Sequence, residues 1–503
     1  MTKCLIIIFL LSVFLSCNHR KAGDSIHPNI IFILADDLGY GDLRCYNPNS
    51  KIPTPNLDML AMKGMRFTDA HSPSALCTPT RYSIMTGKYC WRTELKSGVL
   101  LPYDKPLIHP GETTLASLLN KNGYSTAAIG KWHLGWDWPT KEGFPENWEL
   151  RGNMDGKGID FSKVIHGGPV DLGFEYYYGM DVPNFPPYCY IENNRIVGTI
   201  PSLQKPDSIY GDPGVMQEGW NYESMLSTIT NKAKDYISEQ ARQQTKPFFL
   251  YFALTAPHVP LSPSYQFKGK SQAGNYGDLV AEMDYSVGEI INHLEKLELL
   301  ENTLIIFTSD NGSHARTSNP ERGNYCWGVG DLIHEYNHYP NGLLKGFKGD
   351  AWEGGHRIPF IVHWPEVVKQ NSVNNQLICL TDMLPTVAAL LNNPLPGKAA
   401  PDGINIMATL KNSDAPARDV LVLHSASGKF AVRKNPYKLI LADDGGSCFS
   451  AAYFEKYTPG EWQNNYEGQL YNIQSDIQEE NNLYGQMPET VEQLKSILHD
   501  EKK

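Results

Sequence analysis

The 503-residue sequence lacks an excess of positive charge, because 44 Lys and Arg face 55 Asp and Glu, for a formal net charge of −11. This balance argues against a nucleic-acid partner, and an anionic substrate would need a local cluster of cations. The sequence has no HExxH segment and no Cys or His pair at zinc-ligand spacing, which argues against a zinc enzyme. Internal repeats and low-complexity tracts are absent, and the composition is that of an ordinary globular chain.

The N-terminus carries a targeting segment. An apolar run from Leu5 to Leu15 is too short to span a bilayer as a helix. Leu15-Ser16-Cys17 resembles a bacterial lipoprotein cleavage site, although Phe14 fits that pattern poorly and leaves soluble export as an alternative. We predict that residues 1–17 are an export signal with Cys17 lipidated and that residues 18–26 are a tether. The mature protein is then expected in the bacterial periplasm or at the cell surface, anchored to the membrane by lipid.

Polar residues follow four apolar runs that have the pattern of buried strands. The predicted strands are residues 28–35, 124–129, 248–254 and 303–308. They are followed in turn by Asp36-Asp37, Gly130-Lys131-Trp132-His133, Pro257-His258 and Asp310-Asn311. Predicted helices lie between them, at residues 54–64, 113–122, 223–240 and 276–299. Because open α/β sheets bind ligands at the carboxyl ends of their strands, we expect these polar residues to share one site.

Alternative interpretations remain for individual segments. Asp-Asp before Gly is a common turn sequence, and the Lys131–His133 segment also fits a surface loop with Trp132 packed inward. Residues 139–212 are rich in Gly, Pro, Tyr and Asn, which is typical of a binding loop or of a satellite core. Within them, residues 180–188 are the candidate segment for substrate contacts, with Asn184 as the candidate residue.

The pattern predicts a catalytic domain over residues 27–400, with a mostly parallel central sheet flanked by helices. From about residue 419 the sequence changes to short strands and turns, DVLVLHS, KFAVRK and YKLILAD, followed by a tail helix over residues 488–500. We therefore predict a smaller subdomain over residues 401–503, built from an antiparallel sheet and a helix.

One short segment combines a cysteine with a helix start. In Cys77-Thr78-Pro79-Thr80-Arg81, Pro79 suits the first helical turn, which predicts that Cys77 lies just before the helix. A helix N-terminus favours a negative group. Arg81 lies one turn later on the same face as Cys77, where it would hold whatever Cys77 presents. The alternative is a buried structural cysteine before an ordinary helix.

The predicted strand ends also supply metal ligands and cations. Asp36, Asp37, Asp310 and Asn311 offer three carboxylates and one amide oxygen, a donor set that suits Ca²⁺ or Mg²⁺ rather than Zn²⁺. Three cations and two imidazoles lie at or near the same edge: Arg81, Lys131, Lys348, His133 and His258. Together they would make a site for an oxyanion ester.

This succession of motifs, which ends in Lys348-Gly349-x-x-Trp352-Glu353-Gly354-Gly355, resembles the formylglycine-dependent (type I) sulfatases of the alkaline-phosphatase-like superfamily. The resemblance covers essentially the whole mature chain. Within the family, the chain is similar to bacterial arylsulfatase A-like glycan sulfatases. It implies that a maturation enzyme oxidises Cys77 to formylglycine (3-oxoalanine). It also implies that Ca²⁺, with Mg²⁺ as the alternative, is held by Asp36, Asp37, Asp310, Asn311 and the modified Cys77.

The resemblance further implies a role for each site residue. A hydroxyl of the hydrated aldehyde attacks sulfur, a sulfated enzyme intermediate forms, and loss of sulfate regenerates the aldehyde. Arg81 holds the hydrate and His133 accepts its proton; Lys131 and Lys348 bind sulfate oxygens. His258 binds sulfate and donates a proton to the departing alcohol. Thr80 stands where the family more often has Ser.

The expected substrates are sulfated carbohydrates of the galactose or N-acetylgalactosamine type. One alternative is a phosphodiesterase or phosphatase of the same superfamily, although these typically use Thr or Ser as nucleophile. Another is a non-catalytic glycan-binding relative whose Cys77 is never modified. With Cys4 and Cys17 in the export segment and Cys77 modified, six cysteines remain, and their irregular spacing leaves any disulfide pairing open.

Overall fold

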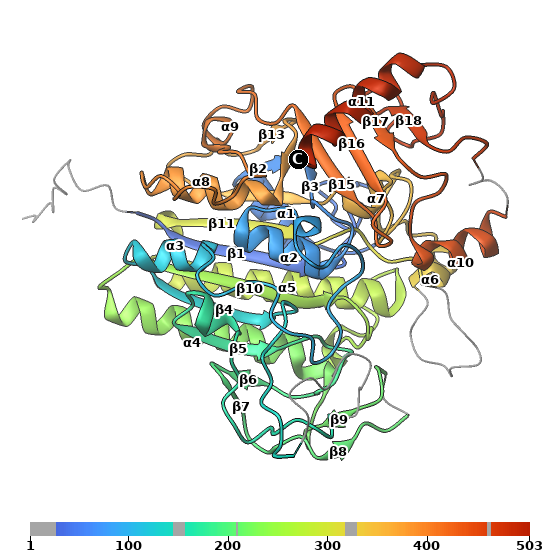
Figure 1. Cartoon of the computed structure of the whole chain (residues 1–503). Helices are drawn as coiled ribbons and strands as arrows, with labels where there is room; N and C mark the ends of the chain where they lie inside the picture. Colours follow the sequence, from blue (N-terminus) through green and yellow to red (C-terminus); the bar gives the residue numbers. More distant parts are fainter. Residues whose placement is uncertain (1–26, 144–155, 208–209, 317–328, 460–463) are drawn as a thin grey trace, which may run out of the picture.

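Figure 1 shows the computed structural model, which describes residues 27–143, 156–207, 210–316, 329–459 and 464–503. The predicted export signal, its Cys17 and the tether lie outside the described residues, and so does Cys326. Among the helices that the structure describes, none is long and apolar enough to cross a membrane. The thiols of five cysteines are free: Cys45, Cys77, Cys90, Cys189 and Cys379.

A ten-stranded sheet forms the centre of the large domain, in the order β13-β2-β12-β11-β1-β10-β4-β5-β6-β7. Its middle strands β11, β1, β10, β4 and β5 are parallel, with β1 between β10 and β11. Their bounds are β1 Asn29–Asp36, β4 Ser125–Lys131, β5 Tyr176–Met180, β10 Phe248–Pro257 and β11 Thr303–Ser309. The flanking strands are β2 Met65–Phe67, β6 Ile191–Glu192, β7 Arg195–Ile196, β12 Phe360–His363 and β13 Ser372–Asn374.

Apolar residues cover both faces of β1, which is why this strand has no polar side before Asp36. Ile30, Phe32 and Leu34 pack in one core, together with α2 (Cys77–Thr86), α3 (Leu115–Lys121) and α8 (Met383–Leu390). Ile31, Ile33 and Ala35 pack in the opposite core, together with α1 (Pro55–Met62), α4 (Met225–Gln243) and α5 (Gly274–Lys296). Successive strand residues point to opposite faces, so a continuous apolar run fills both layers. The predicted α/β class is confirmed.

The structure departs from the sequence-based elements in two ways. Strand β5 was not predicted, because its sequence YYYGM lies among Gly- and Pro-rich loops. The prediction that Cys77 precedes the helix was wrong, because α2 begins at Cys77 itself. Leu76 is the extended N-cap residue, and its carbonyl accepts the first helical hydrogen bond from the Thr80 backbone N–H at 3.2 Å.

The C-terminal sheet is antiparallel with strands in sequence order, as predicted. It contains β15 (Val420–His424), β16 (Phe430–Lys434), β17 (Tyr437–Ile440) and β18 (Gln469–Asn472). The tail helix α11 (Pro488–Glu501) packs on it through Val491, Leu494 and Leu498. The orange and red ribbon of Figure 1 lies beside β3 (Ala70–His71) and α7 (Glu353–His356), and Ser74 forms a β-bridge with His424 there.

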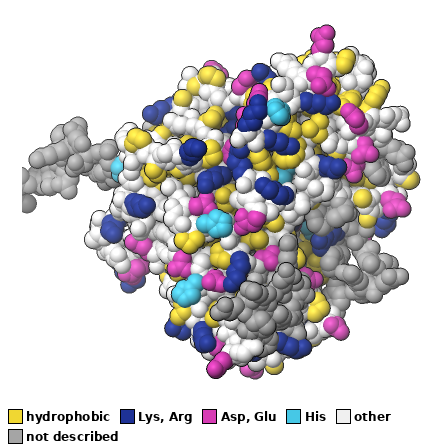
Figure 2. Space-filling view, viewed as in Figure 1, with side chains coloured by type: hydrophobic (Ala, Val, Ile, Leu, Met, Phe, Trp, Pro, Cys, Tyr) yellow, Lys and Arg dark blue, Asp and Glu magenta, His cyan; other side chains and the backbone are white. Residues whose placement is uncertain are grey.

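The remaining elements lie around these two sheets. They are α6 (Val329–Tyr336), α9 (Met407–Lys411), α10 (Cys448–Tyr457), β8 (Leu203–Gln204), β9 (Val215–Met216) and β14 (Ile378–Cys379). Leu410 of α9 packs in the same core as α8, so the large domain receives residues from beyond 400. On the face shown in Figure 2, basic and acidic side chains are interspersed, with hydrophobic side chains scattered between them.

Candidate active site

The carboxyl ends of β1 and β11 bring the predicted oxygen ligands together. Because the two strands pair in parallel with Ala35 opposite Ser309, Asp36–Asp37 and Asp310–Asn311 leave the sheet side by side. The Asp310 backbone N–H donates to the Ala35 carbonyl at 3.1 Å, and the Asp37 backbone N–H donates to Asp310 Oδ1 at 3.1 Å. All four side chains are buried, so their oxygens have little access to bulk water.

Helix α2 delivers Cys77 and Arg81 to this cluster. The Arg81 guanidinium is fully buried and donates to Asp310 Oδ2 at 2.7 Å, to Asp36 Oδ1 at 3.2 Å and to the Lys131 carbonyl at 3.2 Å. The predicted role of Arg81 is to hold the group at Cys77. In the unmodified protein its hydrogen bonds go to the two carboxylates instead, which places both on one guanidinium.

Two lysines neutralise the remaining carboxylate charge. Lys131, the last residue of β4, donates from Nζ to both Asp36 oxygens at 2.8 Å. Lys348 donates to Asp37 Oδ1 at 2.6 Å and Oδ2 at 2.8 Å, and its Nζ also lies 3.2 Å from Cys77 Sγ. Three carboxylates and three cations therefore share one buried cluster, which we call the active-site cluster: Asp36, Asp37, Asp310, Arg81, Lys131 and Lys348.

The carboxylates of the active-site cluster differ in pKa. Burial, followed by repulsion from Asp36, raises the pKa of Asp310 to about 6. Burial also acts to raise the pKa of Asp37, but Lys348 and then His258 hold it well below its ordinary value. Burial raises the pKa of the Cys77 thiol to about 12, despite the two neighbouring lysines. An unmodified Cys77 is therefore a protonated, weakly nucleophilic thiol at neutral pH.

The two imidazoles have different hydrogen-bonding states. His258 follows β10, and its Nδ1 lies 2.7 Å from the Val259 carbonyl, so Nδ1 carries a proton and donates. Its Nε2 lies 3.7 Å from Asp37 Oδ2. His133 places Nε2 at 3.0 Å from the Leu100 carbonyl, while its Nδ1 is buried without a partner. Burial lowers the pKa of both imidazoles well below the ordinary value, which keeps them neutral.

The residues present fit a hard divalent cation. One ligand atom from each of Asp36, Asp37, Cys77 and His258 lies within 4.8 Å of the others. Asn311 Nδ2 donates to Asp37 Oδ1 at 2.8 Å, and this leaves the buried Asn311 Oδ1 without a hydrogen-bond partner. A buried amide oxygen of this kind is costly unless something positive faces it. Carboxylate and amide oxygens are the donors that Ca²⁺ and Mg²⁺ prefer.

A cavity of about 290 Å³ opens onto Cys77, His133, His258 and Lys348. Asn184, the predicted substrate contact, also lines it, and its Oδ1 is buried without a partner. Phe185, from the same predicted contact segment, lines the cavity as well, whereas the lining residues Asp212 and His314 were not predicted. His314 lies only four residues beyond Asp310, so its closeness to the predicted ligands was the available signal. Asp212 gave none, because it lies in a loop without periodicity.

Comparisons with known proteins agree with this geometry. The sulfatase family model matches residues 28–393, more than half of the chain. The chain is 35% identical to an N-acetylgalactosamine-6-O-sulfatase of Bacteroides thetaiotaomicron, over 98% of this chain and 97% of that protein. It is 32% identical to human arylsulfatase A, over 93% of this chain and 87% of that protein.

A solved structure also matches the whole fold. It comes from work on the metabolism of multiple glycosaminoglycans by Bacteroides thetaiotaomicron, and it matches with a TM-score of 0.80 and 33% identity. The match covers 95% of this chain and all of that one. The chain therefore belongs to the sulfatase family and is a sulfuric ester hydrolase.

Proposed function

We propose that this sulfatase acts on sulfated sugars of the galactose or N-acetylgalactosamine type through a formylglycine made from Cys77. The observation that carries the proposal is the position of Cys77. Its Sγ lies 3.2 Å from Lys348 Nζ, in a four-residue ligand cluster with Asp36, Asp37 and His258, and it borders the 290 Å³ cavity. A buried structural cysteine has no need of a cavity or of charged neighbours.

The oxygen ligands would hold Ca²⁺, with Mg²⁺ as the alternative. Asp36, Asp37, Asp310 and Asn311 supply the donors, and the modified Cys77 side chain would complete them. When bound, the cation supplies positive charge beside the sulfate oxygens and the nucleophilic hydroxyl. Arg81 would remain on Asp36 and Asp310, and it thereby keeps the two carboxylates turned toward the site.

The lysines would bind the sulfate group. Lys348 lines the cavity, and Lys131 lies buried next to Asp36. The two ammonium groups would share the neutralisation of Asp36 and Asp37 with the cation that these carboxylates would hold. Their N–H bonds then become available to sulfate oxygens, which stabilises the charge that spreads over these oxygens in the transition state.

The hydrogen bonds of the two imidazoles support opposite roles in proton transfer. His133 Nε2 donates to the Leu100 carbonyl, so the unpartnered Nδ1 offers a lone pair that accepts a proton from the nucleophile side. His258 Nδ1 donates to the Val259 carbonyl, so its Nε2 is the atom that exchanges a proton with the leaving alcohol. Because burial keeps the pKa of His258 low, this acid role depends on the negative charge of the bound sulfate to favour the imidazolium.

The relatives and the cavity support the proposed substrate class. A relative that is similar over nearly its full length is named an N-acetylgalactosamine-6-O-sulfatase. The cavity volume is near the lower end of the ~300–1,000 Å³ that is usual for ligand pockets, which suits one sulfated sugar unit. Asn184 and Asp212 offer polar groups to sugar hydroxyls, and Phe185 offers an aromatic face.

The experiment compares sulfate release from 6-sulfated and 4-sulfated N-acetylgalactosamine and galactose by protein made in its native host. We expect release from at least one of these sugars, and mass spectrometry of the Cys77 peptide should show formylglycine. Faster hydrolysis of phosphate esters than of every sulfated sugar would overturn the proposal. An unmodified Cys77 peptide from an inactive protein would instead favour a non-catalytic glycan-binding role.

Maturation and export complete the proposal. A formylglycine-generating enzyme of the host is the required partner for Cys77. The N-terminal segment would direct the protein to the periplasm or cell surface as a lipoprotein attached through Cys17. Cell fractionation of the native protein and of Cys17→Ala tests this, because only the native form should stay with the membrane. Equal recovery in the soluble fraction would favour export without a lipid.

A further inference from the structure

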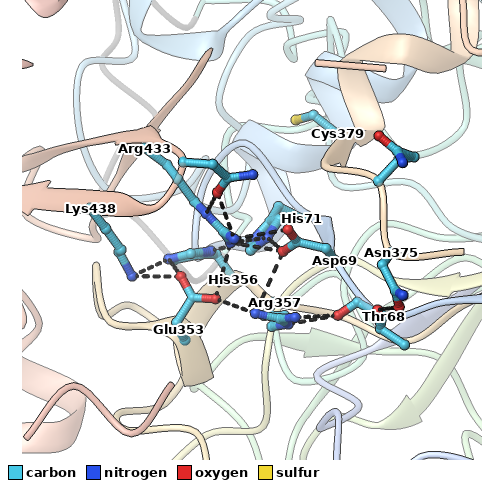
Figure 3. Close-up of polar contacts among 12 residues, drawn as sticks. Thr68, Asp69, His71, Glu353, His356, Arg357, Asn375, Cys379, Arg433 and Lys438 are labelled. Atoms are coloured by element: carbon cyan, nitrogen blue, oxygen red, sulfur yellow. Dashed lines mark hydrogen bonds and ion pairs between the residues drawn. The ribbon is translucent and has the colours of Figure 1, made fainter. Parts of the chain in front are cut away.

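A second buried cluster of charged residues lies outside the active site, at the junction between the large domain and the C-terminal sheet. Figure 3 shows most of it. We call it the junction cluster, and it contains three carboxylates, three cations and two imidazoles: Asp69, Glu353, Glu479, Arg357, Arg433, Lys438, His71 and His356. All except the partly buried Arg357 are shielded from solvent, with Glu353 and Lys438 fully buried.

The junction cluster does not need a metal ion, although His71, Glu353 and His356 place one ligand atom each within 4.8 Å of one another. Lys438 Nζ lies 3.0 Å from Glu353 Oε1 and 3.0 Å from His356 Nε2. The two imidazole Nδ1 atoms are 2.9 Å apart, a hydrogen-bonding distance. The Lys438 ammonium and a proton shared by the two imidazoles therefore occupy the positions that a metal ion would take. The three carboxylates are balanced by the three cationic side chains.

One arm of the junction cluster leads to Cys77. Asp69 and His71 belong to the segment that enters α2, and Cys77 follows His71 by six residues. Arg433 of β16 holds this segment with two parallel bonds to the Asp69 carboxylate, both at 2.8 Å. Between His71 and Cys77, the Ser72 backbone N–H donates to the His356 carbonyl at 2.9 Å. A two-point contact of this kind fixes the orientation of the carboxylate as well as its position.

The other arm leads to Lys348. Glu353 follows Lys348 by five residues, and Lys438 of β17 joins it to Glu479, whose Oε1 lies 2.9 Å from the lysine Nζ. The Glu353 backbone N–H donates to Glu479 Oε2 at 2.7 Å. The intervening backbone is tied to the same subdomain, because the Ala351 N–H donates to the Gly445 carbonyl at 2.7 Å.

The two arms meet at the reacting groups. The Gly349 backbone N–H donates to the Ala75 carbonyl at 2.8 Å, next to the contact between Lys348 Nζ and Cys77 Sγ at 3.2 Å. Neither arm is covalently close to the other, since Cys77 and Lys348 are 271 residues apart. Their relative position therefore depends on noncovalent contacts, and the C-terminal sheet supplies a cation to each arm.

We propose that Arg433 and Lys438 are positioning residues for the sulfatase reaction, and that by holding Asp69 and Glu353 they set the separation between Cys77 and Lys348. The inference rests on the proposed function for its kinetic consequence only. A displacement of about 1 Å at reacting groups costs about a hundredfold in rate. The C-terminal sheet thus contributes to catalysis although none of its side chains is placed in the cavity lining described above.

The test uses variants that keep the junction cluster neutral. In Lys438→Met/Glu479→Gln, one cation and one carboxylate disappear together, while Arg433 and Arg357 still face Glu353. Arg433→Lys keeps the charge but replaces the two-point hold on Asp69 by a single contact, and it serves as the milder variant. Lys434→Met is the matched control, because Lys434 is the neighbouring residue of β16 with a partly exposed side chain and an ion pair to Asp419 at 3.7 Å.

The first readout measures the Cys77–Lys348 separation without any sulfatase activity. Protein made without a maturation enzyme keeps the Cys77 thiol, and ortho-phthalaldehyde joins an amine and a thiol, with loss of water, into a fluorescent isoindole only when both are within its reach. Peptide mapping locates the product. We expect isoindole at Cys77–Lys348 in the native protein and in Lys434→Met, none in Lys348→Met, and a clearly lower yield in the double variant and in Arg433→Lys.

The second readout is steady-state kinetics of matured protein with equal formylglycine content. We expect kcat of the double variant to fall by about a hundredfold, with a smaller change in KM and a cooperative thermal unfolding transition. A folded double variant and a folded Arg433→Lys with the isoindole yield and kcat of Lys434→Met would overturn the proposal. Because the isoindole assay needs no turnover, an inactive native enzyme would refute the proposed function and leave the positioning test intact.

Discussion

The active-site cluster and the junction cluster have the same inventory of charges but differ in what faces them. Each buries three carboxylates against three cations. At the junction, burial acts to raise the pKa of Glu353, but Lys438 and then Arg433 hold it well below its ordinary value. In the active site Lys348 and then His258 do the same for Asp37. Each cluster also holds a carboxylate whose pKa burial raises, Asp310 in the active site, to about 6, and Glu479 at the junction.

The difference lies in what each cluster leaves unpaired. Asn311 Oδ1 and His133 Nδ1 are buried without partners in the active site, and the neighbouring cavity gives ligands access to the cluster. At the junction, Glu479 Oε1 also lacks a hydrogen-bond partner, but it forms an ion pair with Lys438 Nζ at 2.9 Å, and the other groups face one another. Unpaired buried polar groups cost stability, so they mark the place where a ligand is meant to complete the network. The number of buried charges alone therefore does not distinguish a ligand-binding site from a structural contact between two parts of the protein.

The largest loss of activity is expected from removal of the proposed nucleophile, Cys77. Cys77→Ala takes away the group that we propose as the source of the nucleophile but leaves both charge clusters in place. We expect loss of sulfate release by about four to six orders of magnitude, with a thermal unfolding midpoint close to that of the native protein. Cys77→Ser should behave alike unless the host matures serine. Full activity of the alanine variant would refute the assignment.

Metal binding should also distinguish the active-site cluster from the junction cluster. Ca²⁺ added to chelator-treated protein should raise the unfolding midpoint, because a ligand that binds only the folded state stabilises it. Asp310→Asn removes one donor charge and should abolish most of this shift, whereas Glu353→Gln, in the junction cluster, should keep it. Calorimetry that shows the same Ca²⁺ affinity for Asp310→Asn and native protein would contradict the ligand set. A larger shift with Mg²⁺ would reverse the choice of ion.

His258 should show an effect that depends on the leaving group. General acid catalysis contributes about a hundred- to ten-thousandfold, and a sugar alkoxide needs the proton whereas a nitrophenolate leaves without help. His258→Ala should therefore lose far more kcat/KM on a sulfated sugar than on nitrophenyl sulfate. Similar losses on both substrates would reduce His258 to a sulfate-binding residue.

The junction cluster should make stability depend on acid pH. A depressed pKa at Glu353 means that the ionised form stabilises the folded protein above the ordinary pKa of 4.5, and that this contribution is lost as pH falls toward the folded-state value. Glu353→Gln leaves buried cations without their partner and should lower the unfolding midpoint at pH 7. The gap to the native protein should narrow below pH 4.5, and a gap that does not change with pH would contradict the assignment.

Sequence patterns predicted the active site far better than the junction. Apolar runs define β1, β10 and β11, and the polar residues that follow them lie at one sheet edge because parallel strands end together. The junction cluster gave no such signal. Arg433 and Lys438 lie in short strands of ordinary alternation, and their partners are distant in the chain: Asp69 is 364 residues from Arg433, and Glu353 is 85 residues from Lys438. The hydrogen bonds of Arg81 to Asp36 and Asp310 also escaped prediction, because side-chain direction depends on tertiary packing.

The contact between Lys348 and Cys77 can form only late in the synthesis of the chain. In the folded protein Cys77 is only 2% exposed, and Lys348, which lies against it, is synthesised 271 residues later. At roughly 5–20 residues per second, that interval lasts on the order of 10 to 50 seconds. During this period the contact from Lys348 is still missing, which leaves the proposed maturation enzyme more room to reach the cysteine, and slower synthesis of the C-terminal half lengthens the period. Yield of the mature enzyme should thus respond to the pace of synthesis.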